Sequence, residues 1–370
     1  MKVICDRAAL LDAVNLVGGV VVSRTPTPIL LCIKLTAKDG LLILAATDLE
    51  VGLRLGVDQV EVQDEGDILI PSDKLTQIVR ASDDPTLTIE AEGNTVHIRG
   101  KDAHFTIYGY DPKEAPEVRE FGDAAVDCEI DSHILRGLIS RTLFAAATET
   151  SRYAINGVLF DRDGKKLRMV ATDGRRLALA NGDCKAKDGK VSCILPTKAL
   201  NLLNKLIADE EVNVRVAVDD NQAVFAIGEG GTAAILSSNL VEGAFPPFED
   251  VIPRDQDKKV SFDSHSLSSA IRRAALLTNE ESKGVRLSFQ KDQLTLTSRA
   301  PEMGEAEIHV DLTDYEGDPV EIGFNPGFIT DALKVVDGKQ VIFEMKAPNK
   351  PGVIRTGNDF TYVIMPVNLQ

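Results

Sequence analysis

The polar residues best suited to chemistry form one short run, Thr172-Asp173-Gly174-Arg175-Arg176. An aspartate acts as a general acid or base when a histidine or a second carboxylate accompanies it at a matching spacing, and this sequence offers neither. Asp and Gly in succession are typical of a turn, and a Thr-Asp pair also occurs at Thr47-Asp48. We therefore interpret the run as a turn that ends a strand. An enzyme that uses Asp173 or Arg176 remains an alternative.

Other chemical motifs are weaker. The run Gly228-Glu229-Gly230-Gly231 lacks the Lys-Ser or Lys-Thr pair that completes a phosphate-binding loop, and the strand-like sequences on both sides predict a hairpin turn. The histidines have no metal-ligand spacing, and the five cysteines are scattered and never spaced as Cys-X-X-Cys. We expect no catalytic residue, no metal and no cofactor, with the cysteines as reduced core residues of a cytoplasmic protein.

The C-terminal segment Phe360–Gln370 is the strongest candidate for a binding site. An apolar strand runs directly into Met365-Pro366. Because proline ends the strand pairing, Met365, Val367 and Leu369 are left to line whatever surface they meet. Two interpretations are open. The segment is either a last edge strand packed into the core or one wall of an exposed apolar groove for peptides, where a flexible methionine suits varied partners.

The elements that must position these residues recur along the chain. The strand and turn Leu42–Asp48 return as Leu167–Asp173, and a fainter third copy stands at Leu294–Ser298. The helix start Ile70-Pro71-Ser72 returns, at the same offset, as Leu195-Pro196-Thr197. A period this long exceeds that of solenoid repeats and indicates duplicated domains. The sequence predicts three domains, at 1–126, 127–254 and 255–370, because 370 residues are too many for one core.

Each domain is predicted to contain the pattern β-α-β-β-β twice. In the first repeat Asp6 is the predicted N-cap of a helix from Arg7 to Val17, and Pro71 precedes a second helix to Ala81. The expected strands are 1–5, 30–35, 41–46, 50–55, 67–70, 86–91, 95–100 and 104–108. Helices followed by antiparallel strands pack on one face of a sheet, so we expect an α+β fold.

Charge is unevenly distributed. The net charge of −16 argues against tight binding to nucleic acid. The predicted helices nevertheless carry mainly cations, against the acids Asp12, Asp73 and Asp331. These cations are Arg7, Lys74, Arg80, Arg136, Arg141, Lys198, Lys205, Arg272, Arg273 and Lys334. If the helices share one side, that side is mildly basic and the sheets are acidic; the alternative is ordinary solvated helix faces.

The chain resembles the bacterial beta sliding clamps, the processivity subunits of the DNA polymerase III holoenzyme. The resemblance rests on the triple duplication and on the phrases Val170–Ala178 and Tyr362–Val367. Further matches are Tyr153–Gly157, Phe245-Pro246, Asn279-Glu280, Gly284–Leu287 and Ile322–Asn325. The resemblance covers the whole chain. The resemblance implies a DNA clamp fold in which two non-catalytic chains form a head-to-tail, ring-shaped homodimer around double-stranded DNA of any sequence.

The resemblance also implies where the contacts lie. Helices would line the hole, where weak basicity lets DNA slide. By match to the family, the DNA-facing residues are Arg24, Arg152, Tyr153 and Lys198. The dimer interface would join Phe105 and Ile107 of one chain to Leu276 and Leu277 of the other. The protein would act in the cytoplasm, at the nucleoid, with no membrane contact. The alternative is an acidic ring or scaffold that binds peptides without encircling DNA.

A peptide pocket is implied at the middle and last repeats. Its residues by match are Ile155, Thr172, Gly174, Arg175, Arg176, Leu177, Pro246, Val251, Asn325, Phe328, Val363, Ile364, Met365, Pro366, Val367 and Leu369. Short Gln- and Leu/Phe-bearing motifs of the replicative polymerase subunit, clamp loader, repair polymerases, mismatch-repair proteins and ligase would bind there. The sequence departs from the family pattern at Glu149, Arg175, Asp250, Ser282 and Asn368. We expect the pocket departures to alter its specificity for acidic flanking residues.

Overall fold

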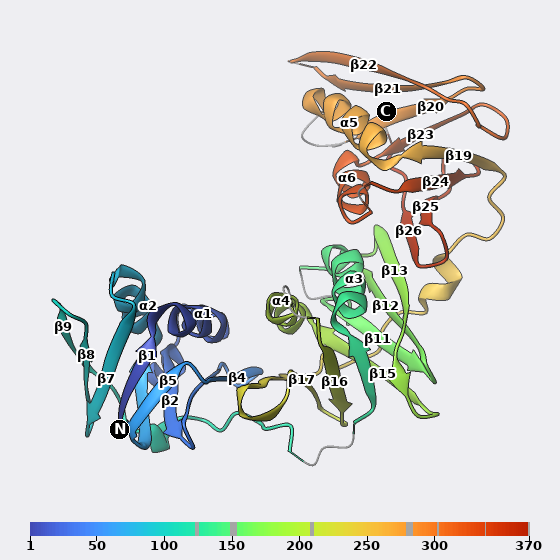
Figure 1. Cartoon of the computed structure of the whole chain (residues 1–370). Coiled ribbons are helices and arrows are strands. Elements are labelled where there is room, and N and C mark those ends of the chain that lie inside the picture. Colours follow the sequence, from blue (N-terminus) through green and yellow to red (C-terminus); the bar gives the residue numbers. More distant parts are fainter. Residues whose placement is uncertain are drawn as a thin grey trace. The chain divides into compact units, whose positions relative to one another are not determined.

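The computed structural model describes residues 1–122, 126–148, 154–207, 211–278, 284–301, 303–336 and 338–368 (Figure 1). The chain is divided into two compact units. The first comprises Met1–Arg136, Cys184–Val191 and Leu195–Leu240, and the second comprises Gly137–Asp183, Ser192–Ile194 and Val241–Gln370.

The first repeat has the predicted pattern. Its elements are β1 (Lys2–Asp6), α1 (Arg7–Gly18), β2 (Cys32–Lys38), β3 (Leu41–Thr47), β4 (Val51–Val57), β5 (Val60–Asp64), β6 (Gly66–Pro71), α2 (Ser72–Ala81), β7 (Thr86–Glu92), β8 (Thr95–Arg99) and β9 (His104–Tyr108). The predicted cap is present, since the Asp6 carboxylate accepts a hydrogen bond from Ala9 N at 2.9 Å. The hairpin at Asp39-Gly40 has φ values of 51° and 74°, as a tight primed turn requires.

The sequence interpretation differs from the structure at two places in this repeat. Strand β5 was not predicted. Leu30 and Leu31 belong to a 3₁₀ turn, Pro28–Leu31, and not to the following strand. Pro28 at the start of that turn has the fixed φ that favours helical geometry, which explains why the strand begins later.

The first unit is built on two antiparallel sheets. One has the strand order β5-β1-β7-β8-β9, and the other has the order β14-β10-β16-β17-β18-β4-β3-β2-β6. The additional elements are β10 (Cys128–Asp131), β14 (Lys185–Ala186), α4 (Thr197–Leu206), β16 (Asn213–Val218), β17 (Gln222–Ile227) and β18 (Ala234–Asn239). Helices α1 and α2 pack against each other and bury Leu10, Val14, Leu75 and Val79 (Figure 1).

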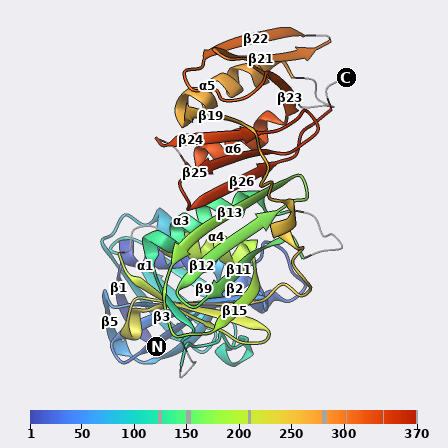
Figure 2. The ribbon, with the colours of Figure 1, turned by 90° about the vertical axis from the view of Figure 1, so that its right-hand side faces the viewer.

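The second unit also contains two sheets, with the orders β15-β11-β12-β13-β26-β25-β24-β19 and β22-β21-β20-β23. Two elements have residues in both units, namely α3 (Ser132–Thr142) and β15 (Lys190–Pro196). The other elements of the second unit are β11 (Gly157–Asp163), β12 (Lys166–Thr172), β13 (Arg176–Asp183), β19 (Lys258–Asp263), α5 (Ser264–Ala274), β20 (Val285–Phe289), β21 (Gln293–Ala300), β22 (Gly304–Asp311), β23 (Val320–Phe324), α6 (Pro326–Lys334), β24 (Gln340–Met345), β25 (Gly352–Thr356) and β26 (Phe360–Ile364). Helix α5 packs on β21 and β22, and α6 packs on β26 (Figure 2).

These elements confirm the α+β fold and the repeated β-α-β-β-β pattern. The middle repeat is shared between the two units because strand pairing continues past the ends of the repeats. Strand β4 pairs with β18, and β13 pairs with β26. Both pairs are antiparallel. The pairing of β13 with β26 therefore brings the Thr172–Arg176 run beside the C-terminal segment.

The structure also tests the predictions for the glycine run and for the cysteines. The glycine run after β17 is a turn between β17 and β18, with Gly228 at φ 79°, so the hairpin prediction is confirmed. All five cysteines are buried, as predicted. Within the part of the chain that the structure describes, no helix is long and apolar enough to cross a membrane.

Candidate functional site

The run Thr172–Arg176 forms the turn that the sequence predicts. The Asp173 Oδ1 atom accepts hydrogen bonds from Arg175 N at 2.9 Å and Arg176 N at 3.0 Å, and Gly174 has a positive φ of 85°. The Asp173 Oδ2 atom binds Arg176 Nε at 3.0 Å. The Thr172 hydroxyl donates to Arg176 O at 2.7 Å. Both carboxylate oxygens of Asp173 are thus engaged in holding the turn.

An apolar cavity of about 240 Å³ lies beside this turn. It is lined by Ile155, Thr172, Gly174, Arg175, Arg176, Leu177, Pro246, Pro247, Phe248, Val251, Val363 and Met365. The antiparallel register places Leu177 opposite Val363. Both residues belong to a buried cluster that also includes Leu159, Val170 and Phe248, so this wall of the cavity is continuous with the core. A concave site with such a lining binds apolar side chains, while the few polar groups at its rim fix their orientation.

Each unit also presents a strand edge. In the described part of the chain β9 pairs with β8 alone, and β22 pairs with β21 alone. Phe105 on β9 is 37% exposed, whereas Leu276, which follows α5, is 76% exposed. Ile107 is buried and Leu277 is half-buried. An open edge beside exposed apolar side chains is suited to pairing with another chain.

Three protein-family models, one for each domain of the DNA polymerase III beta subunit, match consecutive parts of this chain. The N-terminal domain matches residues 1–119, the central domain residues 129–247, and the C-terminal domain residues 249–368. The chain belongs to the bacterial beta sliding clamp family. This confirms the resemblance drawn from the sequence.

Individual clamps match along their whole length. The beta sliding clamp of Pseudomonas putida is 34% identical over 368 residues, which are 98% of this chain and 99% of that protein. The clamp of Escherichia coli K12 is 30% identical over 372 residues, which are 100% of this chain and 100% of that protein. Among solved structures, the subunit beta of Pseudomonas aeruginosa has 33% identity and a TM-score of 0.91. The clamp of Bacillus subtilis has 27% identity and a TM-score of 0.93. Both structures cover 100% of this chain and are themselves covered to 100%.

For this clamp, ten of the predicted pocket residues line the apolar cavity. They are Ile155, Thr172, Gly174, Arg175, Arg176, Leu177, Pro246, Val251, Val363 and Met365. The sequence reasoning missed Pro247 and Phe248, although both directly follow the matched Phe245-Pro246 phrase. The available signal was that these two bulky apolar residues stand in a proline-rich linker.

The other predicted pocket residues lie elsewhere. Ile364 is fully buried, because successive strand residues point to opposite faces and its neighbours Val363 and Met365 face the cavity. Asn325 caps α6 by accepting from Gly327 N at 2.9 Å. Phe328 lies under the Arg176 guanidinium. Pro366 and Val367 line a neighbouring cavity that shares Met365. Leu369 falls outside the described residues.

The predicted DNA-facing residues have different surroundings. Arg24 is exposed in the loop after α1. Lys198 is the second residue of α4, where its Nζ atom donates to Val20 O at 2.9 Å and forms an ion pair with Asp48. Arg152 and Tyr153 lie outside the described residues, as do the departures Glu149 and Ser282. The charge of Lys198 is therefore already engaged within this unit, which was not apparent from the sequence.

The Lys198–Asp48 ion pair contributes to stability in a pH-dependent way. Burial acts to raise the pKa of the Asp48 carboxyl, but hydrogen bonds from Lys198, Val51 and Glu50 outweigh it, so the pKa lies below its ordinary value. A depressed pKa in the folded state stabilises the fold above the ordinary aspartate value of about 4, and this contribution is lost as the pH falls through the folded value.

We expect Lys198→Met to lower the free energy of unfolding by about 1 kcal/mol at neutral pH, since Lys198 is partly exposed and its ion pair is screened. The difference from the wild type should shrink at pH 3. Urea unfolding at both pH values measures it, with Lys205→Met on the same helix as the control. A destabilisation that is the same at both pH values would show that lost packing, and not the ion pair, is responsible.

Proposed function

We propose that this protein is a DNA sliding clamp that gives a replicative DNA polymerase its processivity. Two chains close head to tail into a ring around double-stranded DNA, and the ring holds the polymerase on its template. Membership of the beta sliding clamp family along the whole chain carries this proposal. The protein is a non-catalytic tether and acts in the cytoplasm, on the DNA of the nucleoid.

The charge distribution supports topological binding. A ring does not need a tight grip on phosphates, so a chain with a net charge of −16 can hold DNA that an ordinary surface binder of this charge would release. The cations on the helices are spread along the sequence and form no basic run. Weak, sequence-independent contacts of this kind allow sliding.

The apolar cavity is the proposed docking site for partners. A short segment with glutamine, leucine and phenylalanine buries its apolar side chains among Leu177, Phe248, Val363 and Met365. Replicative and repair polymerases, the clamp loader, mismatch-repair proteins and ligase would compete for it. The three repeats at 1–126, 127–254 and 255–370 are the proposed structural domains of the ring.

Retention on circular DNA tests the proposal. The protein is loaded with a bacterial clamp loader onto a nicked plasmid and then passed through a gel-filtration column at high salt. We expect it to co-elute with the circle and to separate from the DNA once a restriction enzyme has linearised the plasmid. Linear DNA whose ends are blocked by streptavidin should retain it, which distinguishes sliding from salt-induced release. Equal retention on open linear and circular DNA, or no retention on either, would exclude a ring and favour the peptide-binding scaffold.

A further inference from the structure

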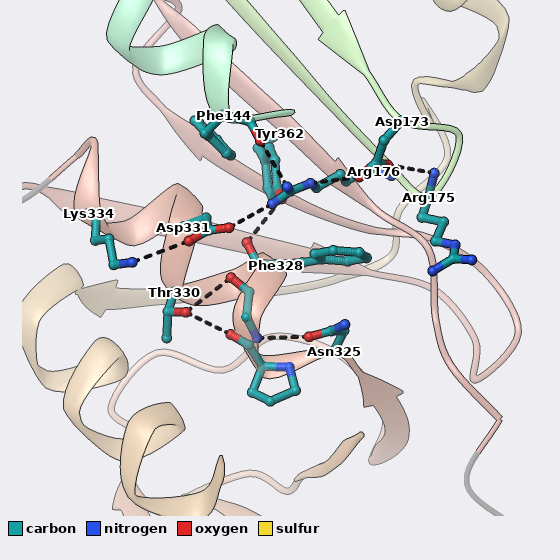
Figure 3. Close-up of polar contacts among 12 residues, drawn as sticks. Phe144, Asp173, Arg175, Arg176, Asn325, Phe328, Thr330, Asp331, Lys334 and Tyr362 are labelled. Carbon is teal, nitrogen blue, oxygen red and sulfur yellow. Dashed lines mark hydrogen bonds and ion pairs between the residues drawn. The ribbon is translucent and has the colours of Figure 1, made fainter. Parts of the chain in front are cut away.

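Arg176 contributes to the lining of the apolar cavity, but its guanidinium is engaged by neighbouring elements (Figure 3). The side chain runs from the turn toward Asp331, Phe144 and Tyr362, whereas Arg175 projects in a different direction. Only 11% of the Arg176 side chain is exposed. A charge buried to this extent must be matched by partners in the protein.

The partners of the guanidinium come from three elements. Nε binds Asp173 Oδ2 at 3.0 Å within the turn, and Nη2 donates to Phe144 O at 2.8 Å in the 3₁₀ turn Leu143–Ala145. Nη1 binds Asp331 Oδ2 on α6 at 2.9 Å. The plane of the guanidinium is also covered, because its central carbon lies 4.5 Å from the Phe328 ring centroid. One side chain therefore joins the cavity wall to helix α6.

Electrostatics favour this arrangement. Burial acts to lower the pKa of Arg176, but Tyr362 and the carboxylates of Asp331 and Asp173 outweigh it, and the net shift is upward. The guanidinium stays charged at every physiological pH. Tyr362 strengthens the same junction by donating its hydroxyl to Phe328 O at 3.0 Å. The hydrogen bonds from the Arg176 guanidinium to Asp173 and Asp331 are charge-assisted, and such bonds are about twice as strong as neutral ones and fix direction as well as distance.

Asp331 lies 155 positions after Arg176 in the sequence, and it does not line the cavity. Its Oδ2 atom holds Arg176, while its Oδ1 atom lies 3.3 Å from Lys334 Nζ. Phe328 is one helical turn before Asp331, so both present the same face of α6 to the guanidinium. Without the Asp331 carboxylate, α6 would still cover the guanidinium but would no longer fix its direction.

We propose that Arg176 is a positioning residue and that Asp331, acting through it, sets how tightly the cavity holds an apolar peptide. The inference rests on the proposed peptide-binding role of the cavity. Thr172, Gly174, Arg175 and Leu177 surround Arg176 in the wall, and the Arg176 backbone carbonyl accepts from the Thr172 hydroxyl. If the guanidinium loses its anchor on α6, the wall is free to move and a bound peptide loses part of its complementary surface.

Asp331→Asn tests the anchor without touching the cavity. The probe is a fluorescein-labelled peptide that carries glutamine followed by leucine and phenylalanine, and its affinity is measured by fluorescence polarisation. We expect binding to weaken about fivefold to tenfold. Asp331→Glu, which keeps the carboxylate, should restore affinity to within twofold of the wild type. Asp183→Asn is the matched control, because Asp183 forms an ion pair with Lys166 at the other end of β13.

A second measurement does not depend on the peptide. Hydrogen exchange followed by mass spectrometry should show faster exchange at residues 172–177 in Asp331→Asn than in the wild type or in Asp183→Asn. Unchanged exchange there overturns the inference, as does wild-type affinity in Asp331→Asn or weakened binding in Asp331→Glu. Failure of the wild type to bind the peptide, with exchange altered as expected, would leave the anchor in place and refute the proposed role of the cavity.

Discussion

Leu276→Lys is expected to convert the proposed ring-forming dimer into monomers. Leu276 is 76% exposed in the single chain, so a lysine there is tolerated by the fold. At the proposed interface the same lysine would be buried against Phe105 and Ile107 with no partner for its charge. Burying an unpaired charge costs several kcal/mol, and about 4 kcal/mol corresponds to roughly a thousandfold weaker association. Light scattering at micromolar concentration should then report the mass of one chain.

The matched control is Leu49→Lys. Leu49 is also strongly exposed, at 61%, but lies in the turn between β3 and β4, two strands that belong to neither of the sheets that end in β9 and β22. This variant should remain a dimer and should be retained on circular DNA like the wild type. A dimeric Leu276→Lys chain, or a monomeric wild type, would show that the proposed interface is wrong.

Much of the fold could be predicted because local signals agreed with one another. Asp6, Pro71 and Asn325 all stand where a helix starts, and the tight turn at Asp39-Gly40 has the backbone geometry that these residue types favour. One error falls where a local rule competes with another one. Pro28 converted the expected start of a strand into a 3₁₀ turn.

The duplication also explains the location of the apolar cavity. In the middle repeat Leu159, Leu177 and Leu179 belong to the cluster beneath the linker. At the corresponding positions the first repeat has Lys34, Gly52 and Arg54. The cavity beside its own linker accordingly contains Lys34 and the Arg54–Glu120 ion pair. Because charged groups resist dehydration, an apolar peptide gains less there than in the middle repeat.

The surroundings of Arg176 could not be predicted from the sequence. Asp331 and Phe144 are distant from it along the chain, and only the folded structure brings them to the same guanidinium. The same is true of Lys198, which matches a DNA-facing position of the family and whose ion pair with Asp48 only the folded structure shows. A pattern in the sequence gives the type and spacing of a residue, whereas its partners depend on the tertiary structure.

A chain that ends at Ile364 is expected to bind the fluorescein-labelled peptide at least tenfold more weakly than the full chain. The truncation removes Met365, which lines both neighbouring cavities. It also removes two backbone anchors, from Met365 N to Arg175 O at 2.9 Å and from Val367 N to Gly323 O at 2.8 Å. A few anchoring residues usually carry most of a peptide's binding energy, so a loss of about 1.4 kcal/mol or more is expected.

Dimerisation should persist in the truncated chain, because the open edges of β9 and β22 are unchanged. Met365→Ala isolates the side chain and should reproduce much of the loss. Met303→Ala is its control, since Met303 is 64% exposed and lines none of the cavities described above. If the truncated chain is folded and dimeric and still binds the peptide with the affinity of the full chain, the C-terminal segment serves only as an edge of the core. The peptide must then bind elsewhere on the clamp.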